Sequence, residues 1–258
     1  MMKTIIFILS LFISINILSQ DTLIVFDRPG VAESPYLVGN RVWQIENGFT
    51  YLNKIGLSSS LIPSFLLRKF LGAQTEIRLG INFEPQMMHV ILDNETHSYI
   101  PIAIGIKHKL WEELKYIPEA SVIVNSFSPI QKLGKLNKSE NYNFELGLQF
   151  QNNLNSNIGI NYNIGTLITH NFSNYILSYA ICANYSLSNK VSVFGEFFSY
   201  MSKQIVNEFG FDGGIVYFPN AYSQIDLSVI NNRFEKNNYL SVLLGYSFSL
   251  NKSLINVH

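Results

Sequence analysis

The feature that most constrains this chain is a two-residue alternation of apolar and polar side chains, repeated in many long segments. Residues 141–151 show it clearly, because aromatic and aliphatic residues there alternate with Asn, Glu, Gly and Gln. The apolar positions of this segment are Tyr142, Phe144, Leu146, Leu148 and Phe150. Successive side chains of a β-strand point to opposite faces, so the pattern predicts strands with one apolar and one polar face.

Twelve such segments are predicted, and most of them are about 10–13 residues long. Strands of soluble proteins average about 5–6 residues, whereas tilted membrane-spanning strands need about 9–11. The pattern therefore predicts an all-β fold, a transmembrane antiparallel up-and-down β-barrel of about 12 strands over residues 41–250. The segments are 41–52, 61–71, 73–83, 98–110, 116–126, 141–151, 156–166, 174–186, 190–201, 209–219, 222–230 and 238–250.

The links between these segments alternate in length, as short periplasmic turns and longer external loops do in transmembrane barrels. Short links are predicted near Gly72 and at 111–115, 152–155, 187–189 and 220–221. Longer polar links are predicted at 53–60, 84–97, 127–140, 202–208 and 231–237, with an intermediate one at 167–173.

A secreted soluble β-sandwich would also show alternating strands, but the composition argues against it. Only 14% of the residues are charged, whereas about 25% is usual for a soluble domain. The predicted polar faces carry Asn, Gly, Ser and Gln rather than the Lys, Glu and Thr expected of a solvent-exposed sheet. The 18 basic and 18 acidic residues cancel, so no basic surface points to nucleic acid. The apolar faces are therefore expected to contact outer-membrane lipid.

The first residues have the pattern of an export signal. A basic start at Lys3 precedes the apolar residues 5–18, and the chain then turns polar. This predicts a cleaved signal peptide over residues 1–19 and the outer membrane of a Gram-negative bacterium as the destination. The alternative is an N-terminal membrane anchor, but the apolar run is shorter than the roughly 20 residues of a spanning helix.

Residues 20–40 lie between this signal and the first predicted strand. Pro29 and Pro35 disfavour a regular central strand there, because proline cannot donate a hydrogen bond to a neighbouring strand. The segment is expected to be either a periplasmic extension or a plug that enters the barrel. At the other end of the chain, residues 251–258 are expected to form a C-terminal tail.

A series of short motifs resembles one family of outer-membrane proteins. The motifs read D-R-P-G-V-A-E-S-P at 27–35, Q-I-E-N-G-F-T-Y at 44–51, P-S-F-L-L-R at 63–68, E-I-R-L-G at 76–80, G-I-K at 105–107, D-G-G-I-V-Y at 212–217 and Q-I-D-L-S at 224–228. In this order they resemble the transporter family of the "MetA-pathway of phenol degradation" type, in its Bacteroidota-like form, over residues 26–250. Residues 126–129 and 230–232 depart from the strand endings usual in that family. The resemblance implies an outer-membrane barrel that transports small molecules, with hydrophobic or aromatic solutes suggested by the family name.

The polar face of each strand is expected to line the lumen. The charged lumen-lining candidates are Glu46, Arg68, Glu76, Arg78, Lys107, Lys109, Glu119, Glu145, Glu196, Asp212 and Asp226. They could form a solute path with walls of mixed charge, or pair with one another and brace neighbouring strands, because an unpaired buried charge is costly; both roles can hold together. Barrels of about eight strands are filled by side chains and those of 16–18 leave an open channel, so about twelve predicts a narrow or partly plugged pore.

The sequence predicts no catalytic, cofactor or metal site. One predicted loop holds His89, Asp93, Glu95 and His97, but no recognised ligand spacing. No phosphate-binding or dinucleotide-binding glycine motif is present. His108 falls on the apolar face with no Ser or Asn partner at a matching depth, which disfavours a lipid hydrolase. Cys182 is the single cysteine, so no intramolecular disulfide can form, and it is expected to be a small packing residue.

The sequence therefore favours a channel or transporter for small molecules over two alternatives. These are a structural or adhesive barrel without transport and a barrel that hydrolyses lipid. The expected partners are outer-membrane lipid, a small-molecule solute and the barrel-assembly machinery during insertion, without a cofactor or nucleic acid.

Overall fold

The computed structural model describes residues 25–54, 59–81, 100–130, 143–169, 174–202, 207–234 and 237–251. These residues form twelve β-strands, each antiparallel to its two neighbours. The strands are β1 (Val42–Lys54), β2 (Ser59–Gly72), β3 (Thr75–Ile81), β4 (Ile100–Trp111), β5 (Glu119–Ile130), β6 (Asn143–Asn153), β7 (Ile158–Thr169), β8 (Asn174–Ser188), β9 (Val191–Met201), β10 (Glu208–Asn220), β11 (Ser223–Phe234) and β12 (Asn237–Asn251).

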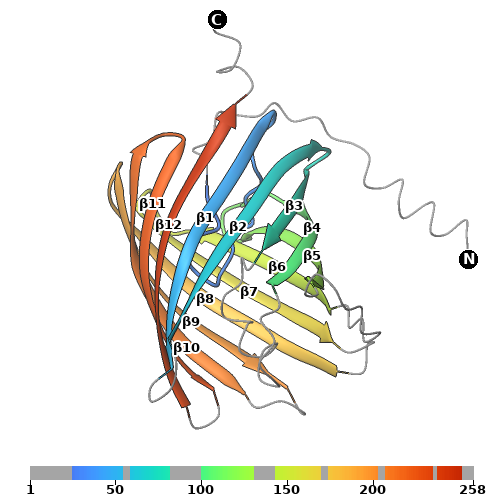
Figure 1. The fold of residues 1–258 in the computed structure, drawn as a ribbon. Coiled ribbons are helices and arrows are strands. Elements are labelled where there is room, and N and C mark those ends of the chain that lie inside the picture. The colour runs from blue at the N-terminus through green and yellow to red at the C-terminus, as the bar shows by residue number, and fades with distance from the viewer. Residues whose placement is uncertain are drawn as a thin grey trace, which may run out of the picture.

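The first and last strands pair with each other and close the sheet into a barrel (Figure 1). Their pairing runs without a register shift from Val42 and Asn251 to Lys54 and Tyr239. Closure removes the open strand edges that the hydrocarbon core of a membrane does not tolerate. The predicted all-β, up-and-down barrel of about 12 strands is confirmed.

The outer surface of the barrel is apolar because the alternation holds along the strands. In β12, Leu240, Val242, Leu244 and Tyr246 are exposed, whereas the residues between them are buried. Lipid-facing barrels present an outward apolar band of this kind, with aromatic residues toward its edges. The polar residues of the same strands consequently face the interior.

The two ends of the barrel differ in how the strands connect. At the end toward which the β12 arrow points in Figure 1, the described links comprise residues 73–74, 112–118, 154–157, 189–190 and 221–222. We call this the turn end and the opposite one the loop end. The link from β2 to β3 is a two-residue turn in which Ala73 and Gln74 both have positive φ, as a type I′ hairpin requires.

The predicted bounds of several links were wrong: residues 53–54, 59–60, 127–130 and 167–169 belong to strands, residues 116–118 belong to a link, and most of the link at 231–237 is strand. Strand β11 extends to Phe234 and β12 begins at Asn237, so residues 231–234 and 237 belong to strands. The polar residues there suggested a loop, but strand pairing joins backbone groups and continues through polar side chains. Asn251, expected in the C-terminal tail, likewise ends β12.

Several other predicted features lie outside the described residues. They are the signal peptide at 1–19, the link at 84–97, the part of the 127–140 link beyond Ile130, and residues 252–258 of the tail. No helix in the described part of the chain has the length and hydropathy of a membrane span.

Candidate functional site

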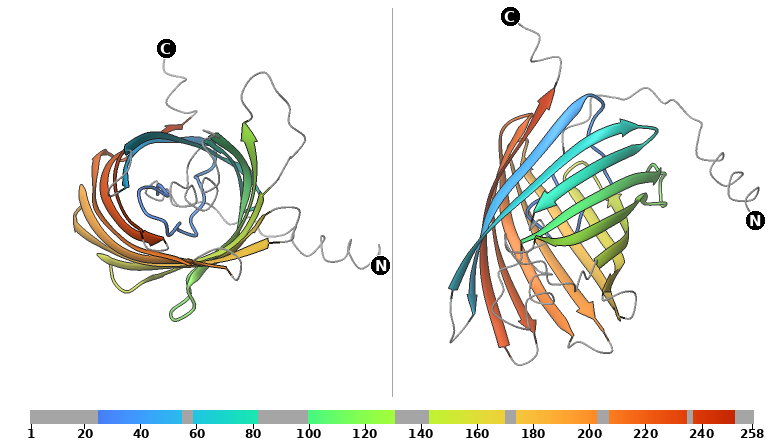
Figure 2. Two further views of the ribbon diagram at one scale, coloured as in Figure 1. Left: turned by 60° about the horizontal axis from the view of Figure 1, so that its bottom comes forward. Right: turned by 45° about the vertical axis from the view of Figure 1, so that its right-hand side comes forward.

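Residues 25–40, which we call the inner segment, lie inside the ring of strands (Figure 2, left). The segment contains neither strand nor helix, so its backbone N–H groups need partners from the barrel wall. Glu46 of β1 accepts hydrogen bonds from the N–H groups of Asp27 and Arg28, at 3.3 and 3.1 Å. Bonds to a carboxylate are stronger than those between neutral groups, so this contact fixes the start of the segment to the wall.

A second wall carboxylate holds the middle of the inner segment. Glu196 of β9 accepts a hydrogen bond of 2.7 Å from each of the consecutive N–H groups of Val31 and Ala32. Beside it, the side-chain amide of Gln224 on β11 donates to the carbonyl of Arg28 at 3.0 Å. The segment is thereby joined to β9 and β11 as well as to β1.

The inner segment also reaches strands β6 and β7. The Asn163 amide of β7 donates to the carbonyl oxygen of Glu33 at 3.0 Å. The Tyr36 hydroxyl accepts hydrogen bonds from Gln151 and Asn153 of β6, at 2.9 and 3.1 Å. Since β6 and β7 lie half a turn of the barrel away from β1 in the strand order, the segment spans the lumen.

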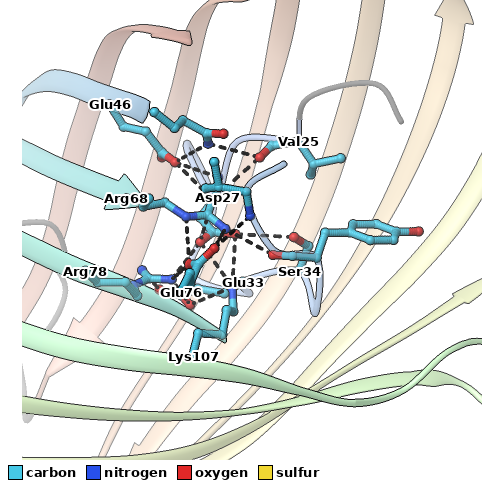
Figure 3. A network of polar contacts seen from close by, with 12 residues as sticks. Val25, Asp27, Glu33, Ser34, Glu46, Arg68, Glu76, Arg78 and Lys107 are labelled. Carbon is cyan, nitrogen blue, oxygen red and sulfur yellow. Dashed lines mark hydrogen bonds and ion pairs between the residues drawn. The ribbon is translucent and has the colours of Figure 1, made fainter. Parts of the chain in front are cut away.

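Three cations extend into the lumen from adjacent strands, as Figure 3 shows: Arg68 of β2, Arg78 of β3 and Lys107 of β4. Strand pairing explains why they meet, because Arg68 is the register partner of Arg78 and Glu76 is the register partner of Lys107. Paired residues point to the same face of a sheet, so all of these side chains lie together on the inner wall.

Carboxylates of the wall balance part of this charge. The guanidinium of Arg68 lies 2.9 Å from Glu76 and 3.2 Å from Glu46. All three side chains are excluded from solvent, where an unpaired charge would be strongly destabilising. The wall therefore provides Arg68 with partners of its own.

Carboxylates of the inner segment balance the rest. Asp27 lies 3.0 Å from Arg68, 2.8 Å from Arg78 and 3.2 Å from Lys107. Glu33 adds a second segment carboxylate, 2.5 Å from Arg78. Burial by itself would raise the pKa of Asp27, but the attraction of Arg68, Lys107 and Arg78 outweighs it and places that pKa well below its usual range. Asp27 is therefore a carboxylate at the centre of the cluster.

A separate seat holds the side chain of Arg28. Ser64, Gly48, Gly245 and Asp226 form one row across β2, β1, β12 and β11, because each pairs with the next. The Arg28 guanidinium lies over this row and donates to the Ser64 hydroxyl at 2.9 Å and to the Asp226 carboxylate at 3.3 Å. A Cβ at Gly48 would overlap the guanidinium, and one at Gly245 would lie 2.6 Å from Arg28 Nε. Only glycine allows so close an approach at these two positions.

The interior is not polar throughout, contrary to the expectation of a polar lumen face. Buried apolar residues gather on the inner wall toward the loop end, where β5, β7 and β9 finish and β8 begins. We call this set the inner apolar patch; its larger members are Phe127, Leu167, Ile176, Phe198, Tyr200, Ile230 and Leu243. Along β8 both faces carry apolar residues, so the alternation in the sequence could not reveal an inward apolar surface there.

Two pockets lie along the lumen, one beyond the other. The first, toward the loop end, is lined by Glu33, Glu145, Gln149, Asn163, Tyr200 and Leu243, among others. The second, toward the turn end, is lined by Gln151, Asn161, Asn184, Phe194 and Phe218, among others. Residues 27–30 of the inner segment line both. We call them the loop-side and turn-side pockets; this short stretch lies between them.

The structure brings most of the charged candidates to the inner segment. Glu46, Arg68, Glu76, Arg78 and Lys107 form the cluster around Asp27, Glu196 binds the segment backbone, and Asp226 binds Arg28.

The other four candidates have contacts or neighbours on the barrel wall. Asp212 is buried beside its register partner Glu196. Glu145 accepts a hydrogen bond from Asn125 at 2.7 Å. Lys109 pairs with Glu119 at 2.6 Å near the turn end.

Sequence reasoning missed the charged residues of the inner segment. Asp27, Arg28 and Glu33 provide the partners of the wall charges, yet they precede the first strand and belong to no alternation. The available signal was the unusual run of charge and proline at 27–35.

The residues considered above for catalysis or metal binding form no such site within the described part of the chain. His108 Nδ1 lies 2.8 Å from the Thr75 hydroxyl, its register partner on β3. His89, Asp93, Glu95 and His97 lie outside the described residues. Within the described ranges no group of three or more His, Cys, Asp or Glu is arranged to hold a metal ion. Cys182 is buried on the inner wall and belongs to the inner apolar patch.

Comparison with protein families confirms the resemblance. Residues 26–250 match the family described as "Putative MetA-pathway of phenol degradation". A comparison with curated proteins found no matching sequence.

Solved outer-membrane barrels share the fold at very low sequence identity. An outer membrane channel from Pseudomonas putida F1 is 10% identical, with a TM-score of 0.56 over 86% of this chain and 99% of that one. The KdgM porin in complex with disordered oligogalacturonate is 8% identical, with a TM-score of 0.55 over 80% and 99%. The CymD monoaromatic hydrocarbon channel is 7% identical, with a TM-score of 0.51 over 83% and 89%.

Proposed function

Because the chain belongs to this MetA-pathway family, we propose that it is an outer-membrane channel for small molecules. The observation that carries the proposal is the lumen, in which two pockets lie on either side of residues 27–30. Displacement of this stretch would join the pockets into one path along the barrel. The shared fold with porins and channels supports the same reading.

The inner segment is proposed to act as the plug of this channel, rather than as a periplasmic extension. Its contacts with β1, β6, β7, β9 and β11 support this role. The lumen charges then have a double role, since they brace neighbouring strands and hold the plug. The mixed-charge wall around the pockets is proposed to line the path once the plug moves.

Small hydrophobic or aromatic solutes are the proposed cargo. The loop-side pocket meets the inner apolar patch at Tyr200 and Leu243. An apolar solute gains about 25 cal/mol for each Å² of apolar surface that leaves water at such a wall. The similarity to a monoaromatic hydrocarbon channel and the family description support the same class.

The location proposed is the outer membrane of a Gram-negative bacterium, reached by means of a cleaved signal peptide over residues 1–19. Lipid would cover the apolar outer surface, and the barrel-assembly machinery would insert the chain. No enzymatic role is proposed.

Conductance tests the channel directly. The purified full chain is reconstituted into planar bilayers and into liposomes, and its folded state is checked by heat-modifiable mobility on gels. We expect small single-channel currents, and liposome swelling with small neutral solutes that exceeds swelling of empty vesicles. A folded barrel that shows neither current nor swelling, including in variants whose plug has been loosened, refutes the proposal and favours a structural or adhesive barrel.

A further inference from the structure

We infer that Arg78 and Lys107 form a binding site for the carboxylate group of a small organic acid, and that Glu33 of the inner segment occupies this site in the structure. The inference rests on the proposed channel function and specifies one class of its solutes. It concerns Glu33, which lines the loop-side pocket and, like Asp27, is in contact with both cations.

The contact between Arg78 and Glu33 has the geometry of carboxylate recognition. Arg78 donates from Nη1 to Glu33 Oε2 at 3.0 Å and from Nη2 to Oε1 at 2.5 Å. Two parallel bonds from a planar guanidinium to one carboxylate are strong and selective for that group. Lys107 Nζ lies 3.4 Å from Oε2 of the same carboxylate and adds a second positive charge.

Arg78 and Lys107 have partners other than Glu33, one on the wall and one in the inner segment. Arg78 and Lys107 extend from paired strands β3 and β4, and their side chains are 1% and 0% exposed. Asp27 lies 2.8 Å from Arg78 and 3.2 Å from Lys107, and Glu76 lies 3.7 Å from Arg78. When Glu33 leaves and Asp27 stays in place, the cations therefore keep their positions, and the site is preorganised for another carboxylate.

Glu33 stands between the cations and the loop-side pocket. Its side chain is 15% exposed, more than those of the cations it covers, and it lines the pocket. A solute in the pocket would therefore meet Glu33 before Arg78. Exchange of Glu33 for the carboxylate of a solute leaves the total charge of the cluster unchanged, so no charge is buried without a partner.

The surroundings of the pocket indicate what the rest of the solute should be. Tyr200 and Leu243 of the inner apolar patch line the same pocket, together with Ala180 and Val31. A small molecule with a carboxylate at one end and an apolar ring at the other would place its charge at Arg78 and its ring against this wall. Benzoate is the simplest probe with this shape, and benzamide is its neutral counterpart of nearly the same size.

Glu33 acts in this scheme as an internal competitor, so its removal should reveal the site. A competitor tethered to the site has an effective concentration of about millimolar or more. The apparent affinity of a free ligand is then its intrinsic affinity multiplied by the fraction of time in which the competitor leaves the site empty. Replacing Glu33 by Gln keeps the size of the side chain and removes its charge. We expect Glu33→Gln to bind benzoate at least about tenfold more tightly than the wild-type protein.

The test is calorimetric titration of the full folded chain in detergent micelles with benzoate and with benzamide. The variants are Glu33→Gln, the double variant Glu33→Gln/Arg78→Gln, and Glu112→Gln as a control at an exposed carboxylate that pairs with Lys109. The double variant removes both members of the pair, so it leaves no Glu33 carboxylate stranded at that position. A melting curve followed by gel mobility establishes that each variant is folded.

The inference predicts that Glu33→Gln binds benzoate more tightly than the wild type, that the double variant lacks this gain, and that Glu112→Gln binds benzoate as the wild type does. Benzamide affinity should be the same in all of these proteins. Equal benzoate affinity in the wild type and Glu33→Gln would overturn it, as would a parallel gain for benzamide. Liposome swelling with neutral solutes separates this result from the proposed function. Swelling without a benzoate site refutes the inference alone, whereas absence of swelling in every folded variant refutes the channel.

Discussion

Replacing Gly48 by alanine should release the inner segment while leaving the barrel folded. The new Cβ would overlap the Arg28 guanidinium, which would have to give up its contacts with Ser64 and Asp226. A hydrogen bond to a charged group contributes about 1.5–3 kcal/mol, and Asp226, which is fully buried, would lose its cation. A loss of about 3 kcal/mol lowers the ratio of docked to released segment about 150-fold, because 1.4 kcal/mol corresponds to a factor of ten.

Hydrogen exchange followed by mass spectrometry measures this release. The N–H groups of Val31, Ala32 and Val38 donate to wall carboxylates, so their exchange reports on docking. We expect their protection to fall by up to about 150-fold in Gly48→Ala, since local opening sets the exchange rate. Amides of the paired strands should keep their protection, and the single-channel current should rise.

Gly195→Ala is the matched control for this change. It adds the same methyl group to a barrel strand, at a position where the added Cβ would have no heavy atom within 4 Å beyond its chain neighbours. Both substitutions remove the backbone freedom of a glycine, worth about 0.5–1 kcal/mol, so that effect cancels in the comparison. If the amides of residues 25–40 exchange equally fast in the two variants, the contacts of Arg28 with Ser64 and Asp226 do not hold the segment, and the predicted role of Arg28 is refuted.

Three further changes test other parts of the site. Arg68→Met leaves buried carboxylates without their cation and should destabilise the barrel by about 3–5 kcal/mol, seen as a lower melting temperature in the gel-mobility assay. Lys109→Met should lower the melting temperature less, because the Lys109 side chain is 14% exposed and one of its two partners, Glu112, is 63% exposed. Glu196→Gln weakens two charge-assisted bonds to the segment and should speed exchange at Ala32 about tenfold, for a loss of about 1.4 kcal/mol; unchanged exchange would show that this contact is dispensable. Because the pKa of Asp27 is held below its ordinary value, its ion pairs stabilise docking of the segment at every pH above about 4 and are lost only as the pH falls further. Protection of the segment's amides from hydrogen exchange that declines between pH 8 and 5 in the wild type, but not in Asp27→Asn, would contradict this.

The barrel could be predicted from the sequence because each strand shows its own alternation of apolar and polar residues. Where one face of a strand contacts lipid and the other a polar lumen, apolar and polar residues alternate with a period of two, as from Tyr142 to Phe150. The number of strands follows from counting such stretches. The pattern fails where that contrast disappears. Along β8 the inward positions Ile176 and Ala180 are as apolar as their outward neighbours, so an inward apolar patch left no separate signal.

The charged candidates were predictable as a set, but their partners were not. Inward orientation follows from alternation alone, and it identified Arg68, Arg78 and Lys107 as members of one face. Which carboxylates meet them depends on a segment with no regular structure, whose path is set by long-range contacts. A bond such as that between Lys107 and Asp27 joins residues 80 positions apart, and no local periodicity encodes it.

The contacts of the inner segment are unevenly distributed, and this suggests an order of release. Asp27 and Arg28 hold it through four wall side chains that are almost entirely buried, whereas Glu33 contributes a carboxylate at the edge of a pocket. Hydrogen bonds at such an edge can be exchanged for bonds to water or solute, so their loss costs less than the loss of the fully buried ones. Glu33 can therefore leave Arg78 while Asp27 still balances the buried cations. Solute binding at the exposed side would precede full release, and the stronger anchor at residues 27–28 would hold most of the segment in place until then.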